Sequence, residues 1–398
     1  MMHLTLLHQD SKRQGVATER NLFDVAVEHP GRILQRMLEK KGWTQDELAA
    51  ITGKTRQTIS LLVSGKSGIT PDMAIVLAAA FQNAPNDWLQ WDANYRLSCA
   101  SGNAAADIQQ KARFYELAPI RDMEKRGWIP ETKSVPELER ALKHFFQTES
   151  FDEEPTFPVA MRRPERLRYL SPPARAWLFR ARQLASAIKV TRAFEHGRLR
   201  QLEQKLRVLA AYPKEAAKLP EVFAEYGIRF VVVEPLPNGT MDGAAFWLDE
   251  NSPVIAVSVR YDRMDIFWFT VMHEFAHVRN GDGLAVDTEL IAETAKETPT
   301  LLREEQETRA NTEAAAALVS PDELDSFIRR VGPLYSKVRI VQFAHRIKIH
   351  PSIIIGQLQH RGELSPRTNK EMLPKIRNVI TATALTDGWG RTISPGML

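Results

Sequence analysis

The sequence predicts a multidomain, mainly α-helical protein with a small β-sheet confined to its C-terminal half. The chain has 398 residues, more than one hydrophobic core ordinarily holds. Its hydrophobic content of 43% and charged content of 26% are typical of a globular chain. Helix-capping patterns recur from Pro30 to Glu225, and three apolar runs that read as strands follow between residues 228 and 259.

Composition excludes two classes of protein. The single cysteine, Cys99, rules out an intrachain disulfide. No apolar run approaches the roughly 18 residues of a membrane helix, and the apolar stretch at the N-terminus is too short for a signal peptide. We therefore expect a cytoplasmic protein with no membrane partner. The net charge of +4 is compatible with a nucleic-acid partner but does not require one.

Small residues near Ala100 and a change of pattern at Gly227 punctuate the chain. We divide it into an N-terminal extension at 1–29, a compact series of short helices at 30–98, a helical linker or middle region at 99–225, an α+β domain at 226–333, a C-terminal helical part at 334–380 and a loose tail at 381–398.

The segment 30–98 has the pattern of a helix-turn-helix. Thr44 and Glu47 form a capping box at the start of one helix, and Gly53 ends it. A second helix follows over 54–62, after a short turn that contains this glycine, and Thr70 caps the next. Such a pair of helices indicates binding to double-stranded DNA, although a small bundle for protein contacts is the alternative.

In this motif the N-terminal part of the second helix enters the major groove. Arg56 is suited to reading guanine and Gln57 to reading adenine. Contacts with phosphates or bases are expected from Thr55, Ser60 and Gln45. Residues 1–100 carry eleven Lys/Arg against ten acids, so the helix pattern, and not the charge, indicates an operator-binding domain.

The same segment resembles the HigA-type branch of the XRE helix-turn-helix family. The matching segments are Thr44–Ala49, Gly65–Pro71 and Trp88–Tyr95. The resemblance implies a five-helix, lambda-repressor-like domain. It also implies a repressor or antitoxin that binds a palindromic operator as a homodimer.

Positive charge is concentrated between Arg162 and Arg200, where eleven Lys/Arg stand against two acids. One interpretation is a solvated helical face whose arginine stems cover apolar surface. The other is a surface that binds a nucleic-acid trigger.

Strands and helices alternate in the C-terminal half. Residues 228–234, 244–248 and 254–259 read as strands, and an apolar helix is expected at 264–280, closed by Gly281. A loop at 283–300 leads to an alanine-rich helix at 303–319. Ser320 and Glu323 predict a capping box for the next helix, and residues 335–360 predict two short helices.

The helix at 264–280 carries an HExxH motif. His273 and His277 are one turn apart on one face, so both imidazoles reach one ion. Glu274 lies about 100° round the helix, where it reaches a metal-bound water as general base. The helix is apolar nearly all round and therefore buried, and a Zn²⁺ ion gives its polar groups a partner. The alternative is a histidine pair satisfied by hydrogen bonds in the core.

A catalytic zinc ion takes three protein ligands. Asn280 and Gly283 occupy the positions where HExxHxxGxxH requires Gly and His, which excludes that class. Glu307 is the best third ligand, because the small residues after it let its helix lie close to the motif. Asn311, one turn later, is expected to support the site from the second shell. The competing ligands are Glu304, Glu305, Asp282 and Glu293.

Residues 226–345 resemble the ImmA/IrrE family of metallopeptidases. The matching segments are Asp242–Ala244, Arg260–Tyr261, Phe267–Thr270, His273–His277, Glu307–Asn311 and Pro321. The resemblance implies a zincin-like fold, zinc ligation by His273, His277 and Glu307, and cleavage of a repressor after stress. Glu313 and Ala314 depart from the pattern, since many members have an aromatic residue before the alanine.

The substrate contacts are less defined. Stabilisation of the oxyanion by Tyr261, His345 or His350 is considered, and the strand 254–259 is expected to align an extended peptide by strand addition.

The leading hypothesis is a DNA-binding regulator that hydrolyses a regulatory protein, either a repressor or an antitoxin-like protein in a stress or toxin–antitoxin circuit, with Glu274 as general base. The runner-up is a repressor or antitoxin whose metallopeptidase-like domain only binds a protein partner, such as a toxin. A third hypothesis makes the zinc ion structural.

Overall fold

The computed structural model describes residues 28–100, 103–152, 155, 157, 170–283, 285–288 and 301–388. The chain divides into two compact units, residues 1–109 and residues 110–398. The predicted extension at 1–29 lies outside the described residues except for Glu28 and His29. Among the described residues, no helix is both long and apolar enough to cross a membrane.

The first unit consists of short helices with clear local stop and start signals. Its helices are α1 (Pro30–Lys41), α2 (Gln45–Thr52), α3 (Arg56–Val63), α4 (Pro71–Phe81) and α5 (Pro85–Ala100). Thr44 and Glu47 form the predicted capping box, and Gly53 ends α2 at a φ of 64°. The side chains of Thr55 and Thr70 accept backbone N–H bonds at the starts of α3 and α4.

The second unit contains the sheet. Its helices up to the first strand are α6 (Asn103–Leu117, which begins before the unit boundary), α7 (Ile120–Lys125), α8 (Val135–Phe146), α9 (Pro172–Ala187), η2 (His196–Arg198), α10 (Leu199–Leu209), η3 (Pro213–Lys218) and α11 (Leu219–Ala224). The later helices are α12 (Met264–Asn280), α14 (Leu301–Leu318), α15 (Pro321–Val331), α16 (Lys337–Ile347), α17 (Pro351–His360), η4 (Lys370–Met372) and α18 (Arg377–Ile380).

Five strands form one mixed sheet in the order β4-β2-β3-β1-β5. They are β1 (Arg229–Val233), β2 (Met241–Trp247), β3 (Pro253–Val257), β4 (Ala285–Thr288) and β5 (Leu385–Asp387). β1 is parallel to both β3 and β5, whereas β2 is antiparallel to β3 and β4. The ladder between β2 and β4 is irregular between Met241 and Gly243.

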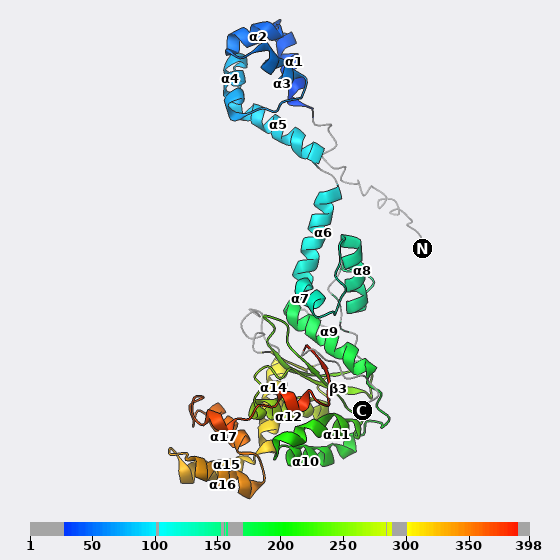
Figure 1. Cartoon of the computed structure of the whole chain (residues 1–398), viewed down its shortest axis with the longest axis vertical. Helices are drawn as coiled ribbons and strands as arrows, with labels where there is room; N and C mark the ends of the chain where they lie inside the picture. The colour runs from blue at the N-terminus through cyan, green and yellow to red at the C-terminus, as the bar shows by residue number, and fades with distance from the viewer. Residues whose placement is uncertain are drawn as a thin grey trace, which may run out of the picture. The chain divides into compact units, whose positions relative to one another are not determined.

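Both faces of the sheet are covered by helices, as Figure 1 shows with α9 on one side and α10, α11 and α12 on the other. Val231, Val254 and Phe246 point into the core under α9. Their neighbours along the strands, such as Val232 and Ile255, point into the core that contains α12. Strands buried on both faces read as continuous apolar runs, which explains why three of them were visible in the sequence.

The helices predicted as a linker or middle region pack on the sheet instead. Trp177 of α9 is fully buried and its indole N–H donates to the carbonyl of Val233 at 2.8 Å. Leu206 of α10 and Phe223 of α11 belong to the core that contains α12. From residue 110 this region is therefore part of the second unit.

Three local predictions are wrong. The predicted loop at 283–300 contains β4, and the predicted loose tail contains β5, while residues 289–300 and 389–398 lie outside the described residues. β5 forms because a buried Leu385 and the ladder to β1 stabilise three residues that have no local strand signal. Ser320 precedes α15 without a side-chain capping bond, so the predicted capping box is not formed.

The predicted role of the strand at 254–259 in aligning a peptide is also wrong. β3 is hydrogen-bonded to β2 on one side and to β1 on the other. A strand with partners on both sides has no free backbone edge on which another strand can be added.

Candidate metal centre and DNA-binding surface

The two histidines of the HExxH motif lie on α12 with almost no solvent exposure. α12 ends where predicted, because Gly281 adopts a left-handed conformation with a φ of 62° and its N–H bonds back to the helix. His273 is 2% exposed, His277 1% and Glu274 0%. Burial at this depth requires each polar group to have a partner.

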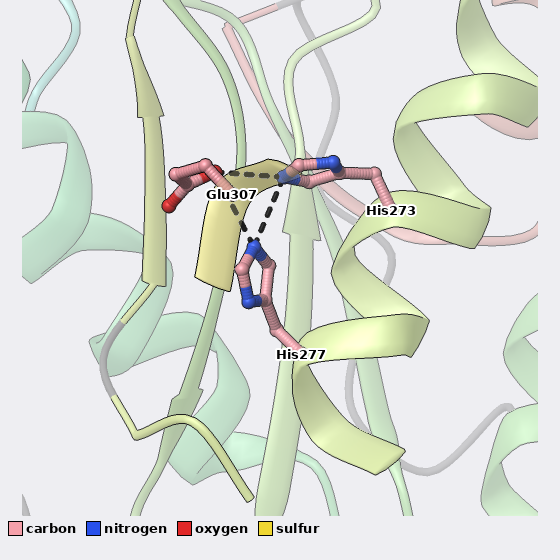
Figure 2. Close-up of side chains that lie close together, drawn as sticks. All are labelled: His273, His277 and Glu307. Atoms are coloured by element: carbon pink, nitrogen blue, oxygen red, sulfur yellow. Dashed lines mark hydrogen bonds and ion pairs between the residues drawn. The ribbon is translucent and has the colours of Figure 1, made fainter. Parts of the chain in front are cut away.

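Glu307 brings a carboxylate from α14 to the same point, as Figure 2 shows. The Nε2 atoms of His273 and His277 are 3.0 Å apart. Oε2 of Glu307 is 3.2 Å from Nε2 of His273 and 3.5 Å from Nε2 of His277. Three ligand atoms from two helices thus converge on one small volume.

The donor set fits a zinc ion. Four-coordinate zinc holds nitrogen and oxygen ligands at roughly 2.0–2.2 Å, which places neighbouring tetrahedral donors roughly 3.3–3.6 Å apart. The three separations of 3.0, 3.2 and 3.5 Å need only small adjustments to match. Two imidazoles and one carboxylate are also the ligand chemistry of catalytic zinc sites, with a fourth position left for water or substrate.

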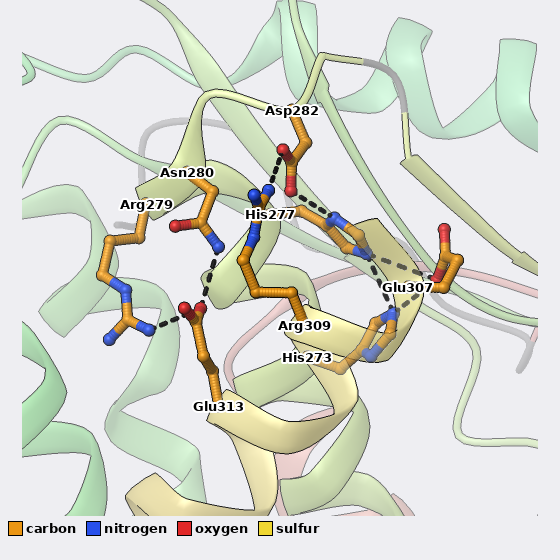
Figure 3. Close-up of polar contacts among 8 residues, drawn as sticks. All are labelled: His273, His277, Arg279, Asn280, Asp282, Glu307, Arg309 and Glu313. Carbon is orange, nitrogen blue, oxygen red and sulfur yellow. Dashed lines mark hydrogen bonds and ion pairs between the residues drawn. The ribbon is translucent and has the colours of Figure 1, made fainter. Parts of the chain in front are cut away.

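Asp282 supports the site from behind His277. Its Oδ2 lies 3.0 Å from Nδ1 of His277, the ring nitrogen that faces away from Glu307. The turn at Gly281 places Asp282 there, and its N–H donates to the carbonyl of His277 at 3.1 Å. Arg309 of α14 pairs with the other oxygen of Asp282, as Figure 3 shows. This contact fixes the orientation of the imidazole and leaves Nε2 on the side of Glu307, where it could ligate a metal ion.

A second set of contacts joins the C-terminal end of α12 to α14. Arg279 pairs with Glu313 at 2.6 Å and also with Glu203 of α10. The amide of Asn280 donates to Glu313 at 2.8 Å (Figure 3). Glu313, one of the departures from the family pattern, therefore fixes the helix that carries Glu307 against the helix that carries the histidines.

The electrostatics of the site favour a cation between the donors. Burial lowers the pKa of His277, but its hydrogen bonds to Asp282 and Glu307 outweigh burial and raise the pKa to about 10. Burial raises the pKa of Glu307, yet the two imidazoles outweigh it and hold this pKa well below its usual range. Surroundings that stabilise a proton on His277 to this extent also favour a divalent cation, which must displace that proton.

Nε2 of His273, Nε2 of His277 and Oε2 of Glu307 form a triangle of candidate ligands, called the ligand triangle below. Glu274 is not one of its members, and its side chain points toward β2. A Cβ atom on Gly243 would lie 2.4 Å from Oε1 of Glu274 and 2.8 Å from Cγ2 of Thr270. A side chain at position 243 would therefore force Glu274 or Thr270 to shift. The sequence carried a signal for this contact, because a glycine inside an apolar strand often marks a close approach.

The structure separates the other candidate ligands from the site. Asp282 contacts the outer nitrogen of His277 and not the ligand triangle. Glu305 is exposed, while Glu293 and the side chain of Glu304 lie outside the described residues. Asn311 is exposed on α14, and no hydrogen bond described for this part of the chain joins it to the three ligands, so the predicted second-shell contact is not formed. Asp282 makes the supporting contact that was predicted for Asn311, and Arg309, which no pattern in the sequence indicates, pairs with Asp282.

None of the three residues considered for the oxyanion faces the ligands through a described contact. Tyr261 is 45% exposed and stacks with the guanidinium of Arg260. His345 is exposed on α16. His350 caps α17, where its Nδ1 accepts the N–H of Ser352 at 3.2 Å.

In the first unit, the predicted DNA-reading residues lie on one exposed surface. Thr55, Arg56, Gln57 and Ser60 are exposed at and along α3, and Gln45 is half-buried at the start of α2. Nε of Arg56 is 3.2 Å from Oδ1 of Asp46, and both side chains are mostly exposed. An exposed pair of this kind is weak, so it leaves Arg56 able to turn toward a base. The hydroxyl of Thr55 accepts the N–H of Thr58 and caps α3. Any contact of this hydroxyl with DNA would be made in addition to the capping bond.

The described arginines of the basic stretch at 162–200 are largely engaged within the protein. Nε of Arg180 is 2.6 Å from Oδ2 of the buried Asp387, and Arg198 stacks on the ring of Tyr226 at 4.6 Å. Arg175 is 4% exposed. These contacts support the interpretation that arginine stems cover apolar surface. Residues 162–168 lie outside the described residues, and the nucleic-acid trigger stays a prediction.

Comparisons with known proteins match both halves of the chain. A helix-turn-helix family model matches residues 34–88, and the model of a peptidase family described as the IrrE N-terminal-like domain matches residues 225–350. Virulence-associated protein A' of Dichelobacter nodosus is 38% identical over 82 residues, which are 20% of this chain and 71% of that protein. The uncharacterized HTH-type transcriptional regulator YddM of Escherichia coli K12 is 29% identical over 85 residues, 21% of this chain and 88% of the regulator.

Among solved structures, an addiction module antidote protein of a HigA family from Coxiella burnetii is similar to part of the chain. The sequence identity is 25%, and the match covers 21% of this chain and 91% of that protein with a TM-score of 0.20.

Proposed function

Because the chain belongs to the XRE-type helix-turn-helix family through residues 34–88 and carries an IrrE N-terminal-like peptidase domain at 225–350, we propose that it is a DNA-binding regulator with a zinc-dependent endopeptidase domain. Its substrate is a regulatory protein, a repressor or an antitoxin-like protein, in a stress or toxin–antitoxin circuit. A DNA-bound regulator works where the DNA is, so the proposal includes a cytoplasmic location.

One observation carries the peptidase proposal. Three buried or half-buried donors, His273, His277 and Glu307, converge at zinc spacing, and Glu274 follows directly on the same helix without joining the triangle. A purely structural zinc site closes its fourth position with a protein ligand. Among the described residues, no fourth donor joins this cluster, which favours catalysis.

The residues of the chain divide the chemistry between them. When bound, zinc polarises the scissile carbonyl and lowers the pKa of a water molecule. The carboxylate of Glu274 would accept one proton of the water as the water oxygen attacks the carbonyl carbon, and would pass this proton to the amine nitrogen as the C–N bond breaks. Gly243 leaves room for the carboxylate of Glu274 beside β2, and Asp282 holds the imidazole of His277 in one orientation. Burial of α12 shields the two histidines from bulk water.

The test is the Glu274→Gln variant, which keeps the shape of the side chain and removes the base. We expect it to bind as much zinc as the wild type and to lose cleavage by a factor of roughly 10² or more. Candidate substrates are the products of neighbouring genes, incubated with the zinc-loaded protein with and without DNA and followed by mass spectrometry.

Two results separate the hypotheses. Wild-type rates in Glu274→Gln would refute its role as the base. Tight zinc binding in both proteins, with no cleavage by either, would favour the alternative in which the domain only binds a protein partner.

The DNA-binding proposal rests on the exposed surface of α3. We propose that Arg56 and Gln57 read base edges, that Gln45, Thr55 and Ser60 contact phosphates or bases, and that a homodimer binds two operator half-sites about 34 Å apart. Sedimentation with and without a fragment of its own promoter tests whether the protein binds this DNA and whether it binds as a dimer. A stable monomer on a single half-site would contradict the dimer.

A further inference from the structure

Three large apolar side chains are exposed close together at α16, which lies next to α15 and α17 in the second unit (Figure 1). Leu334, Val338 and Val341 are 80%, 64% and 45% exposed. Val338 and Val341 are one helical turn apart on one side of α16. Leu334 lies two residues before Ser336, the N-cap of the helix. These three residues are called the α16 stripe below.

The opposite side of α16 fixes the helix to the protein. Ile340, Phe343 and Ala344 are buried in the core that contains α12. The ring of Phe343 stacks on that of Phe327 of α15, with 4.3 Å between their centres. A helix that is apolar on its inner side is expected to be polar on its outer side. The exposed valines break this pattern, and apolar residues that gather on one exposed face mark contact surfaces.

The surroundings of the α16 stripe are strongly basic. Between Ser326 and Gly362 the chain has seven Lys/Arg and no Asp or Glu. Lys337 and Arg339 are the neighbours of Val338, and each is turned by about 100° from it, in opposite directions. Both side chains are exposed. The apolar stripe therefore has a cation on each flank.

Part of this charge has no counter-charge within the protein. Lys337, Arg346 and Arg361 pair with Glu371, Glu323 and Asp325, and in each pair both side chains are at least one-third exposed. Exposed pairs of this kind are weak and can exchange partners. Arg329, Arg339 and Lys348 are exposed and have no ion pair with another described residue. The surface therefore has positive charge available to a partner.

The combination of apolar and basic residues distinguishes among partners. A second copy of this chain in a symmetric contact would bring the same cations face to face. A nucleic acid would pair with the cations but would leave the apolar side chains against its polar backbone. A membrane surface calls for a wider apolar face with residues such as Trp, Phe and Leu. An acidic amphipathic helix fits both features, since its apolar side covers the α16 stripe and its carboxylates pair with the flanking cations.

We propose that the α16 stripe and its flanking cations bind an acidic amphipathic helix of a partner protein. The bound helix has apolar residues at positions i, i+3 or i+4 and i+7, and acidic residues on both flanks. This contact requires neither a metal ion nor peptidase activity, so it goes beyond the proposed function and stands apart from it.

The experiment measures binding of a synthetic helix to the full-length protein by fluorescence anisotropy. The labelled peptide has about three heptads, with leucine at the a and d positions and glutamate at e and g, where the like charges keep it from pairing with itself. Two control peptides carry lysine in place of each glutamate or serine in place of each leucine. We expect the acidic leucine peptide to bind about 10-fold or more tightly than either control.

Two variants locate the binding surface. Val338→Glu places a carboxylate in the apolar stripe, and Arg339→Glu reverses one flanking charge. Each is expected to weaken binding of the acidic peptide by about 10-fold or more. The matched control is Ile75→Glu, because Ile75 of α4 is 58% exposed and belongs to the first unit. It should keep the wild-type affinity, and melting temperatures establish that all three variants are folded.

Three results of the peptide assay would overturn the proposal. They are failure of the acidic peptide to bind, equal binding of the lysine peptide, and unchanged binding in Val338→Glu. An equal loss in Ile75→Glu would do the same, because the effect would then not be specific to α16.

Two further measurements test the other partners. Sedimentation compares the wild type with Val338→Glu, and a dimer that dissociates in the variant would assign the surface to a second copy. Flotation with vesicles of phosphatidylcholine and phosphatidylglycerol tests the membrane, and wild-type binding that is lost in Val338→Glu would assign the surface to lipid. Either result would overturn the proposal, whereas no difference between the two proteins in both assays supports it.

Discussion

Replacing Gly243 with alanine is expected to displace the carboxylate of Glu274 and to leave the three metal ligands in place. The new Cβ atom would lie 2.4 Å from Oε1 of Glu274, whereas tolerated contacts begin at 3.0–3.4 Å. The oxygen must therefore recede by 0.6–1.0 Å, the difference between those distances. The backbone of β2 cannot easily move instead, because β3 and β4 bond it on both sides.

A displacement of this size has a large effect on catalysis and a small effect on stability. Misplacing a catalytic group by about 1 Å costs on the order of 10²-fold in rate. Overpacking of a core typically lowers the free energy of unfolding by about 1–3 kcal/mol. Replacing glycine with alanine also reduces the conformational entropy of the unfolded chain, which offsets about 0.4–1 kcal/mol of this loss. The melting temperature should accordingly fall by a few degrees.

The assay compares cleavage rate, zinc content and melting temperature for the wild type and two variants. Gly197→Ala is the control, because no atom lies within 4 Å of the added Cβ there. Gly243→Ala should keep its zinc and lose about 10²-fold in rate, while Gly197→Ala keeps both. Full activity in Gly243→Ala would refute the tight contact, and loss of zinc along with activity would refute the claim that only the base moves.

Four further predictions concern the ligands, their support, the DNA surface and a buried histidine. Glu307→Ala leaves two of the three donors, so dialysed protein should retain little zinc by elemental analysis; full retention would exclude Glu307 as a ligand. Asp282→Asn should weaken zinc binding about 10- to 100-fold in competition with a chelator, since it removes the anion that orients His277; an unchanged affinity would exclude that role. Arg56→Ala should weaken operator binding by about 1–3 kcal/mol, measured by fluorescence anisotropy, with the exposed Lys40→Ala as control; equal losses in both variants would mean that Arg56 reads no base. Burial lowers the pKa of His350 below 6.5, so the folded protein favours the neutral form and loses stability as pH falls below about 6.5; the acid-induced drop in melting temperature should be smaller in His350→Asn, and an equal drop would contradict this.

The parts of the fold that were predictable have local signals. Thr44, Glu47 and Gly53 mark the ends of α2 through contacts between residues at most four apart. Gly281 ends α12 in the same way. The strands at the centre of the sheet were visible because burial on both faces leaves only apolar residues in them.

The parts that were missed depend on contacts between distant residues. β5 consists of three residues, and its Asp387 is fixed by Trp128 and Arg180, more than 200 positions earlier in the chain. No window of sequence around Leu385 contains that information. For the same reason the helices before Gly227 read as a linker, since the sheet face that buries Trp177 comes later in the chain.

In the candidate site, too, local features could be predicted and contacts between distant residues could not. The spacing of His273 and His277 is a local property of a helix, and the small residues after Glu307 indicated a close neighbour. Asp282 was a candidate ligand because a carboxylate can bind zinc. The turn at Gly281, which depends on the folded structure, places it against the outer nitrogen of His277 instead. Asn311 was chosen by helical spacing alone, and the crossing of α12 and α14 directs it toward solvent instead.

The topology of the sheet also decides where an extended substrate can pair with it. β3 and β1 have hydrogen-bonded partners on both sides, so within the described residues the open edges belong to β4 and β5. β5 is the other open edge, and β1 and β3 separate it from β2, the strand next to the carboxylate of Glu274. β4 pairs directly with β2, whose Gly243 opposes Asp287 in the register and Glu274 across the sheet face. For the proposed peptidase we therefore expect an extended substrate to pair with β4, the open edge that is joined directly to β2.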